Sequence, residues 1–214
     1  MCLIVSHVTS DTPAPLSAIE QRVLDAALEC SARWGFARVT IDDIARSSGV
    51  SRASIYRFFP GGKEVLFESL RVRELEAFFT ELRTEVAASE SLEDLMVRSV
   101  VTATRCLRND AHLATMLASE PGEALGQLTV DGLPRIIRMA SMTLIPLARP
   151  FMAPRDASRV IDLLARLTIS YFLAPSEDVD LTDEADARRF LAPVLAVAAG
   201  AGSEHPITPD RSSR

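Results

Sequence analysis

Residues 41–58 read IDDIARSSGVSRASIYRF, which is the pattern of a helix-turn-helix. The two halves of this stretch are short, and Gly49 separates them. Glycine adopts the positive φ that a tight turn between two helices needs, whereas a residue with a Cβ is strained there. Apolar residues predict the contacts between the two crossed helices: Ile44, Val50, Ile55 and Phe58.

The second half of the stretch is rich in hydrogen-bond donors and contains no acidic residue. The donors are Ser51, Arg52, Ser54, Tyr56 and Arg57. A recognition helix enters the major groove of DNA by its N-terminal residues, and its dipole favours phosphate. The pattern therefore predicts DNA binding. The alternative is a purely structural helical hairpin, since short helices joined by glycine are common.

Helix starts flank this motif on its N-terminal side. Ser17 and Glu20 have the spacing of a capping box, in which each side chain satisfies an otherwise unpaired amide, and Thr40-x-x-Asp43 opens a second helix with Thr40 as its cap. Between them, apolar residues recur at helical spacing from Ile19 to Trp34, and Gly35 follows. This stripe predicts a helix with one buried face.

The remaining sequence predicts more helices and no strand, because no useful length of it alternates between apolar and polar residues. Residues 123–153 are apolar but contain several glycines and prolines, so they predict a broken helix with loops. The other expected helices cover residues 63–88, 91–108, 110–119, 154–173 and 182–199, the last one capped by Thr182. The chain is thus expected to be all-α, with about nine helices.

The pattern divides the chain into four parts. Residues 1–15 are rich in Ser, Thr and Pro and predict a flexible arm, and the polar residues 203–214 predict a disordered tail. Between them we expect a three-helix domain with the helix-turn-helix over residues 16–63, and a larger helical domain over residues 64–202.

Charge and composition are those of a folded globular protein. Of the 214 residues, 48% are apolar and 24% are charged, and the net charge is −6, which excludes a polybasic nucleic-acid coat. Residues 17–63 nevertheless carry seven basic and five acidic side chains, a net charge of +2. The acidity therefore belongs to the rest of the chain and does not exclude DNA binding. Such a surface should lose affinity steeply with salt.

The spacing of the cysteines and the hydropathy of the chain are typical of a cytoplasmic protein. Cys2, Cys30 and Cys106 lie far apart with no C-x-x-C pair, so a disulfide framework is not expected. No signal peptide or membrane-spanning segment is recognisable. The sequence predicts a soluble cytoplasmic protein with no membrane contact.

Catalytic chemistry is not expected. The three histidines are scattered, and no G-x-S-x-G elbow or dinucleotide loop is present. His112, Met116 and Glu120 share a helix face, but this poor ligand set for a metal is better interpreted as the edge of a pocket or core. The sequence therefore predicts no enzyme, no metal site and no cofactor.

Residues 17–70 resemble the DNA-binding domain of the TetR family of one-component transcriptional regulators. The positions that carry the resemblance are Gly35, Thr40, Ile44-Ala45, Gly49-Val50-Ser51, Tyr56, Phe59 and Lys63. One departure is Gly61-Gly62 before Lys63, where many members have a single small residue.

The resemblance implies a set of DNA contacts. Thr40, Tyr56 and Lys63 would contact phosphates. The residues that would face base edges or the backbone in the groove are Ser51, Arg52, Ala53 and Ser54, with Arg57 in the same set. Arg52 is the candidate for bidentate recognition of guanine. For Lys63 the alternative is a solvated loop charge.

For residues 64–202 the resemblance implies a domain that binds a small effector and forms dimers. The candidate effector-binding residues are Met96, Val100, Leu113, Met116, Leu117, Met139, Met142 and Tyr171. Thioether-rich surfaces adapt to apolar ligands, but the same methionines also suit an ordinary core. Residues 118–129 and 166–182 are similar to a TetR C-terminal subfamily linked to control of lactone catabolism, which implies an acyl or lactone-like effector.

The last two helices are the expected dimer interface. Each has a second, partly small and apolar side, which includes Ala187 and Ala198 and suits a two-fold four-helix contact. The alternative is that these sides belong to the intramolecular core. A homodimer places two recognition helices about one DNA turn (~34 Å) apart, as a palindromic operator requires.

The function expected from this resemblance is that of a repressor which a mainly apolar effector releases from double-stranded DNA. The helix over residues 63–88 joins both domains and would transmit the effector's signal. Two alternatives stay open: an activator, and a ligand-binding protein of the same fold that lost DNA recognition.

Overall fold

The structure is a computed structural model, and it describes residues 16–201. These residues form ten α-helices and no strand, so the predicted all-α class is confirmed. The expected arm, residues 1–15, and the expected tail, residues 203–214, lie outside the described residues. The chain divides into two compact units between Leu70 and Arg71.

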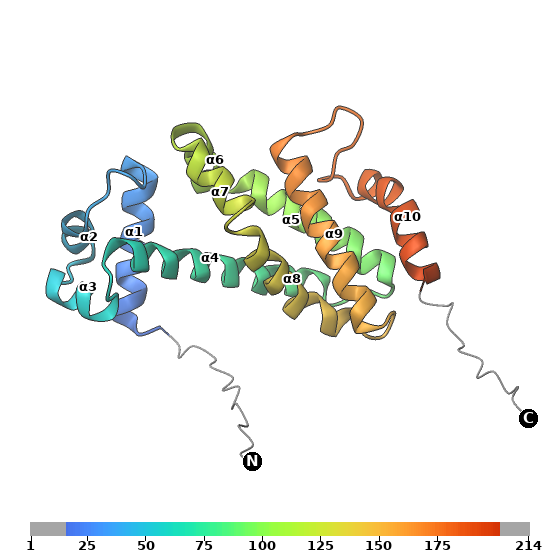
Figure 1. Ribbon diagram of the computed structural model, residues 1–214, viewed down its shortest axis with the longest axis horizontal. Coiled ribbons are helices and arrows are strands. Elements are labelled where there is room, and N and C mark those ends of the chain that lie inside the picture. Colours follow the sequence, from blue (N-terminus) through green and yellow to red (C-terminus); the bar gives the residue numbers. More distant parts are fainter. Residues whose placement is uncertain (1–15, 202–214) are drawn as a thin grey trace, which may run out of the picture. The chain divides into compact units, whose positions relative to one another are not determined.

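Three helices and the first turns of a fourth make up the N-terminal unit (Figure 1). They are α1 (Ala18–Trp34), α2 (Ile41–Ser48), α3 (Arg52–Phe58) and α4 (Lys63–Val86). The predicted capping box at Ser17 and the predicted cap at Thr40 are both confirmed, and the structure shows that Thr40 also belongs to a capping box. Ser17 accepts from the backbone N–H of Glu20 at 3.3 Å and donates its own N–H to the Glu20 carboxylate at 2.8 Å, and Thr40 forms the same reciprocal pair with Asp43.

A single apolar core holds these helices together. Its largest fully buried side chains include Leu24 of α1, Ile44 of α2 and Ile55 of α3. Three side chains of α4 are buried in the same core: Leu66, Phe67 and Leu70. The first unit therefore extends to Leu70, beyond the boundary expected at residue 63, because these side chains find their apolar partners on α1 to α3.

The two ends of the apolar stripe on α1 are not buried. Ile19 is 39% exposed and Trp34 is 41% exposed, so their expected place on the buried face is wrong. The helix α2, which packs on α1, has 8 residues against the 17 of α1. Only the middle of α1 is therefore covered.

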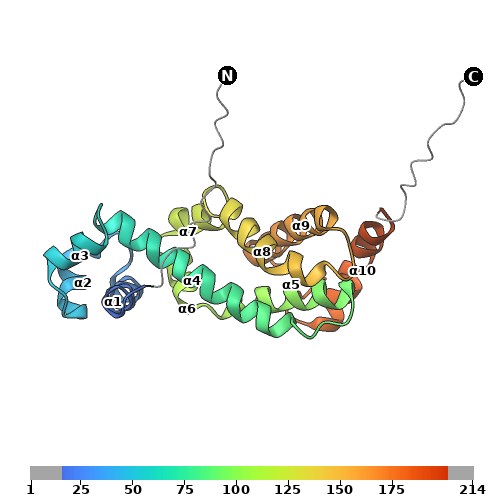
Figure 2. The same ribbon diagram turned by 90° about the horizontal axis from the view of Figure 1, so that it is seen from below.

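The C-terminal unit contains the rest of α4 and six further helices. They are α5 (Leu92–Asn109), α6 (Ala111–Ser119), α7 (Pro121–Leu128), α8 (Leu133–Ala148), α9 (Pro154–Leu173) and α10 (Glu184–Ala201). The helices α8 and α9 run side by side in both views (Figures 1 and 2), and α5 packs against α9 and α10.

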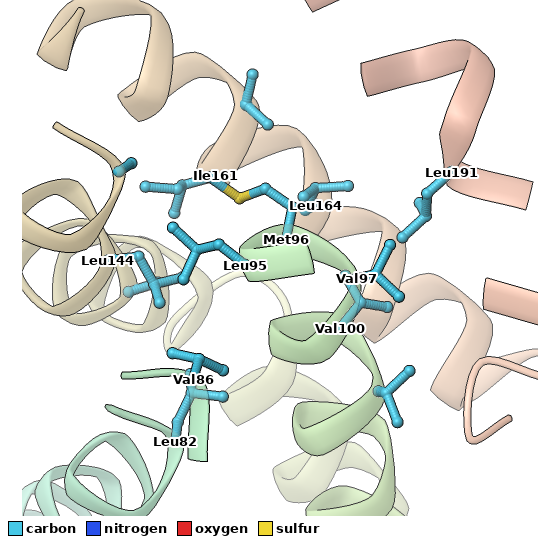
Figure 3. Packing of buried hydrophobic residues seen from close by; sticks show 14 of the residues in the cluster. Leu82, Val86, Leu95, Met96, Val97, Val100, Leu144, Ile161, Leu164 and Leu191 are labelled. Carbon is cyan, nitrogen blue, oxygen red and sulfur yellow. The ribbon is translucent and has the colours of Figure 1, made fainter. Parts of the chain in front are cut away.

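The core of this unit is centred on α5. Figure 3 shows Met96 beside Ile161 and Leu164 of α9, while Val97 faces Leu191 of α10. Met96 and Val97 are completely buried, and Leu191 is too. One helix thus joins α9 and α10 through close apolar packing.

The expected interruption of the apolar residues 123–153 is confirmed, because α7 ends at Leu128, α8 begins at Leu133 and no helix covers residues 149–153. Pro121 and Pro134 stand in the first turns of α7 and α8, where a missing N–H leaves no bond unmade. Pro146 lies inside α8 and does not end it. The described residues thus contain one helix more than the expected nine or so.

The last helix begins at Glu184, so the expected cap at Thr182 is wrong. The Asp183 carboxylate accepts from the backbone N–H of Asp186 at 2.9 Å and acts as the cap. The Thr182 hydroxyl instead donates to Asp180 at 2.8 Å. The Thr182 hydroxyl is therefore bonded to Asp180, and Asp183 caps α10 in its place.

Ion pairs connect the first turns of α10 and α5. The guanidinium of Arg188 lies 2.9 Å from Glu184 one turn earlier in α10, and 3.0 and 3.3 Å from Glu93 and Asp94 in the first turn of α5. Hydrogen bonds to Glu184 and Glu93 raise the pKa of Arg188 above its ordinary value. Each exposed pair stabilises little alone, but the shared arginine fixes how the two helix starts meet.

Candidate DNA-binding surface

The turn between α2 and α3 has the geometry that the sequence predicts. Gly49 has φ +66° in the left-handed region. The Ser48 hydroxyl accepts from the backbone N–H of Val50 at 3.2 Å, and the Ser51 hydroxyl accepts from that of Ser54 at 3.2 Å. The turn is therefore short, and serine hydroxyls accept hydrogen bonds from two backbone amides that the helices leave unpaired.

The helix α3 buries one side and exposes the other. Ile55 is completely buried, whereas Ser54 and Phe58 are half-buried. The other sequence-predicted residues of this segment are exposed: Ser51, Arg52, Ala53, Tyr56 and Arg57. The fold thus brings the predicted donors together on one accessible helix, as binding in a groove requires.

Arg52 has a partner that sequence reasoning missed. Its guanidinium lies 2.9 Å from the carboxylate of Asp42 on α2. The two residues are ten positions apart, and only the crossing of α2 and α3 brings them together. No spacing rule within one helix signals such a pair.

Thr40 is engaged within its capping box. Its hydroxyl donates to Asp43 at 2.6 Å and accepts from the Asp43 backbone N–H at 3.3 Å. A hydroxyl has one proton, so donation to a phosphate requires Thr40 to release the Asp43 carboxylate. The Thr40 hydroxyl, and then its backbone N–H, hold the pKa of Asp43 below its ordinary value.

This bond predicts a pH dependence. A carboxylate whose pKa is lower in the folded than in the unfolded state stabilises the fold above its unfolded value of about 3.9, and this contribution is lost as the pH falls through the folded value. Thr40→Val removes the hydroxyl, so the pKa of Asp43 should rise toward its ordinary value. An NMR titration of the Asp43 carboxyl measures it, and an unchanged pKa would contradict the assignment.

Lys63 is held by the loop between α1 and α2. Its ammonium donates to the carbonyl oxygens of Phe36 at 2.6 Å and Ala37 at 3.3 Å, and it lies 4.5 Å from the centroid of the Phe36 ring. An ammonium has three donors, so one N–H stays available for a phosphate. Lys63 is half-buried and tied to the fold, unlike the solvated loop charge that was the alternative.

The two glycines before Lys63 have positive φ, +117° at Gly61 and +74° at Gly62. A Cβ at Gly62 would lie 3.1 Å from Cε1 of the Tyr56 ring. The departure from the common family pattern therefore gives Tyr56, a predicted phosphate contact, the space in which it lies.

Gly62→Ala should consequently lower stability and displace Tyr56. A side chain forced into positive φ costs about 1–3 kcal/mol, and the methyl group would also press on the ring. Gly49→Ala is the matched control, because φ is also positive there but nothing lies within 4 Å of the added Cβ. Urea denaturation should show a loss for both variants, whereas the NMR signals of the Tyr56 ring should shift only for Gly62→Ala. Unchanged signals in both variants would count against this role.

The predicted effector-binding residues fall into three groups. Met96 and Val100 are buried in the close-packed core around α5, and Met139 and Tyr171 are half-buried against it. Met142 is 61% exposed. The remaining three are half-buried on α6: Leu113, Met116 and Leu117.

The last two helices expose part of their apolar surface. Leu163 of α9 is 47% exposed and Val197 of α10 is 75% exposed. The rings of Tyr171 and Phe190, both packed against the core of this unit, lie 5.2 Å apart and bring the two helices into contact. Ala187 is completely buried in the core of its own unit, so its expected place on the outer side is wrong. The side chain of Ala198 is not among those described.

Neither a membrane-spanning helix nor a metal-binding cluster is found in the part of the chain that the structure describes. None of the helices in residues 16–201 is both long and apolar enough to span a membrane. Among the side chains that the structure describes, which do not include those of His112 and Glu123, no three from His, Cys, Asp or Glu gather in a way that could hold a metal ion.

These features define a helix-turn-helix protein with a second helical unit after its DNA-binding domain. Residues 23–70 match the model of the bacterial regulatory proteins of the tetR family. The N-terminal unit therefore contains a DNA-binding domain similar to that of the tetR family.

Relatives by sequence are transcriptional regulators. An uncharacterized HTH-type transcriptional regulator of Mycobacterium tuberculosis strain CDC 1551 is 29% identical over 120 residues, which cover 52% of this chain and 61% of that protein. SrpR of Pseudomonas putida is 42% identical over 71 residues, 32% of this chain and 33% of SrpR. The chain thus spans less than two thirds of either relative. Both are named as regulators and neither as an enzyme, which agrees with the predicted class.

Solved structures share the fold. The TetR family repressor AlkX from a Dietzia strain superposes with a TM-score of 0.63 at 21% identity, covering 87% of this chain and 100% of AlkX. A transcriptional regulator of Streptomyces coelicolor A3(2) gives 0.56 at 21% identity, covering 83% and 98%. The predicted helix-turn-helix domain followed by a helical domain is thereby confirmed as the fold.

Proposed function

We propose that the protein is a transcriptional repressor that binds a palindromic operator as a homodimer in the cytoplasm. The observation that carries this proposal is α3, which exposes Ser51, Arg52, Tyr56 and Arg57 and contains no acidic residue. Its N-terminus and its donors suit phosphates and base edges.

The dimer is proposed to form through α9 and α10. Large apolar side chains that stay exposed on neighbouring helices favour burial against a second copy. Leu163→Asp with Val197→Asp should therefore yield monomers in sedimentation experiments. Val130→Asp is the matched control, because Val130 is 81% exposed and lies between α7 and α8. A dimer that survives the double substitution would refute this interface.

The effector is proposed to be a mainly apolar, acyl or lactone-like molecule that binds among α5 to α9. An effector shifts DNA affinity only by the difference between its own affinities for the two arrangements of the protein. The helix α4 is the proposed lever, because its side chains belong to the cores of both units. Thermal shift with aliphatic lactones and the corresponding hydroxy acids tests this class, and absence of any stabilisation by either would reject it.

DNA binding is tested with the full-length chain and duplexes of random central sequence. Selection should enrich a two-fold symmetric sequence, and the affinity should fall on the order of 10³-fold or more between about 50 and 200 mM salt if six or more phosphates are contacted. Failure to enrich any sequence, together with intact folding, would leave a ligand-binding protein of this fold. Reporter transcription that rises with the protein would instead indicate an activator.

A further inference from the structure

We propose that Asp42 determines operator specificity by orienting Arg52 toward a guanine. The inference rests on the proposed DNA-binding function and assigns a role to an acidic residue of α2 within it. Asp42 would act through Arg52 and would not itself touch a base, so it is a positioning residue.

The geometry leaves one edge of the guanidinium free. A single nitrogen of Arg52, Nη1, lies 2.9 Å from Oδ1 and 3.1 Å from Oδ2 of Asp42. Within residues 16–201, Nε and Nη2 of Arg52 donate to no protein group. These two nitrogens form the side-on edge of the guanidinium, with two parallel N–H groups.

That free edge matches guanine. The O6 and N7 atoms of guanine accept two hydrogen bonds from one arginine in the major groove. A long arginine side chain otherwise samples many rotamers, and a carboxylate that holds Nη1 removes part of this freedom before DNA arrives. Asp42 and Arg52 are 53% and 59% exposed at their side chains, so in the free protein the pair is weak. Its bonds strengthen once DNA excludes water from them.

The negative charge of Asp42 also favours the operator over other DNA. A carboxylate beside α3 repels the phosphates of any duplex, whatever its sequence. On a duplex with guanine opposite Arg52, the gain from orienting Arg52 offsets this repulsion. On a duplex without that guanine, the repulsion is not offset. Asp42 therefore weakens non-specific binding and strengthens the preference for guanine.

The test is selection from random duplexes with full-length wild-type protein and four variants. Arg52→Ala marks the positions at which this arginine reads guanine. Asp42→Asn should bind a random-sequence duplex several-fold more tightly and lose about tenfold of its guanine preference at those positions. Asp42→Glu should keep most of the preference, because its carboxylate can still pair with Nη1. Glu29→Gln is the control for the loss of one negative charge, because Glu29 is exposed on α1, and it should leave the preference unchanged.

The outcomes separate the two proposals. If wild type selects guanines that Arg52→Ala loses but Asp42→Asn keeps at full strength, the role of Asp42 is refuted while DNA binding stands. Asp42→Asn that weakens the preference at every operator position equally would show a merely structural effect and also refute it. If wild type selects no sequence, both proposals fail.

Discussion

Replacing Ile55 with alanine is expected to destabilise the N-terminal unit by about 2–5 kcal/mol and to abolish DNA binding near 37 °C. Ile55 is completely buried where α3 meets the core of α1, α2 and α4. A core of this size has few other side chains that can move into the cavity. Because small domains are marginally stable, such a loss removes much of their free energy of unfolding.

The effect should be confined to one unit. Urea denaturation followed by NMR should show early loss of the signals of residues 16–70, while the signals of α5 to α10 keep the wild-type midpoint. Ile19→Ala is the matched control, since it deletes the same atoms from a side chain that is 39% exposed, and it should cost well under about 1 kcal/mol. Equal losses in the two variants would show that the core does not depend on Ile55.

Arg52→Ala is expected to have the largest effect on sequence discrimination. A bidentate arginine–guanine contact contributes about 1–3 kcal/mol of preference over the wrong base, and a dimer makes it in both half-sites. The variant should thus lose about 2–6 kcal/mol of preference, on the order of 30-fold to 10⁴-fold, for the operator over a guanine-substituted duplex. Affinity for random DNA should change far less.

Arg52→Lys separates charge from geometry. Lysine keeps the positive charge but cannot present two parallel N–H groups, so Arg52→Lys should keep the wild-type affinity for random DNA and still lose the preference for guanine. Fluorescence anisotropy with matched duplexes at one fixed salt concentration measures both quantities. Retention of the full preference by Arg52→Ala would remove Arg52 from base recognition.

The parts of the fold that depend on neighbouring residues were predictable. The capping box at Ser17, the cap at Thr40, the left-handed Gly49 and the helix over residues 154–173 all follow from interactions within a few positions of the chain. Such interactions act before any tertiary contact forms. The donors of α3 share an accessible side for the same reason, because helical periodicity alone separates them from Ile55.

Features that depend on distant residues were not predictable. The bonds from Lys63 to the carbonyls of Phe36 and Ala37 join residues more than twenty positions apart. The exposure of Met142 and the burial of Ala187 depend on which side of each helix meets its neighbours. Amphipathic spacing defines an apolar side but not its partner.

The sequence by itself determined the all-α class, the helix-turn-helix and the donors that α3 presents, since each depends on local backbone geometry and a 3.6-residue period. Only the tertiary structure decided that Asp42 holds Arg52 and that Gly62 makes room for Tyr56. Both depend on how separate segments cross, and crossing is settled by side-chain packing in the shared core.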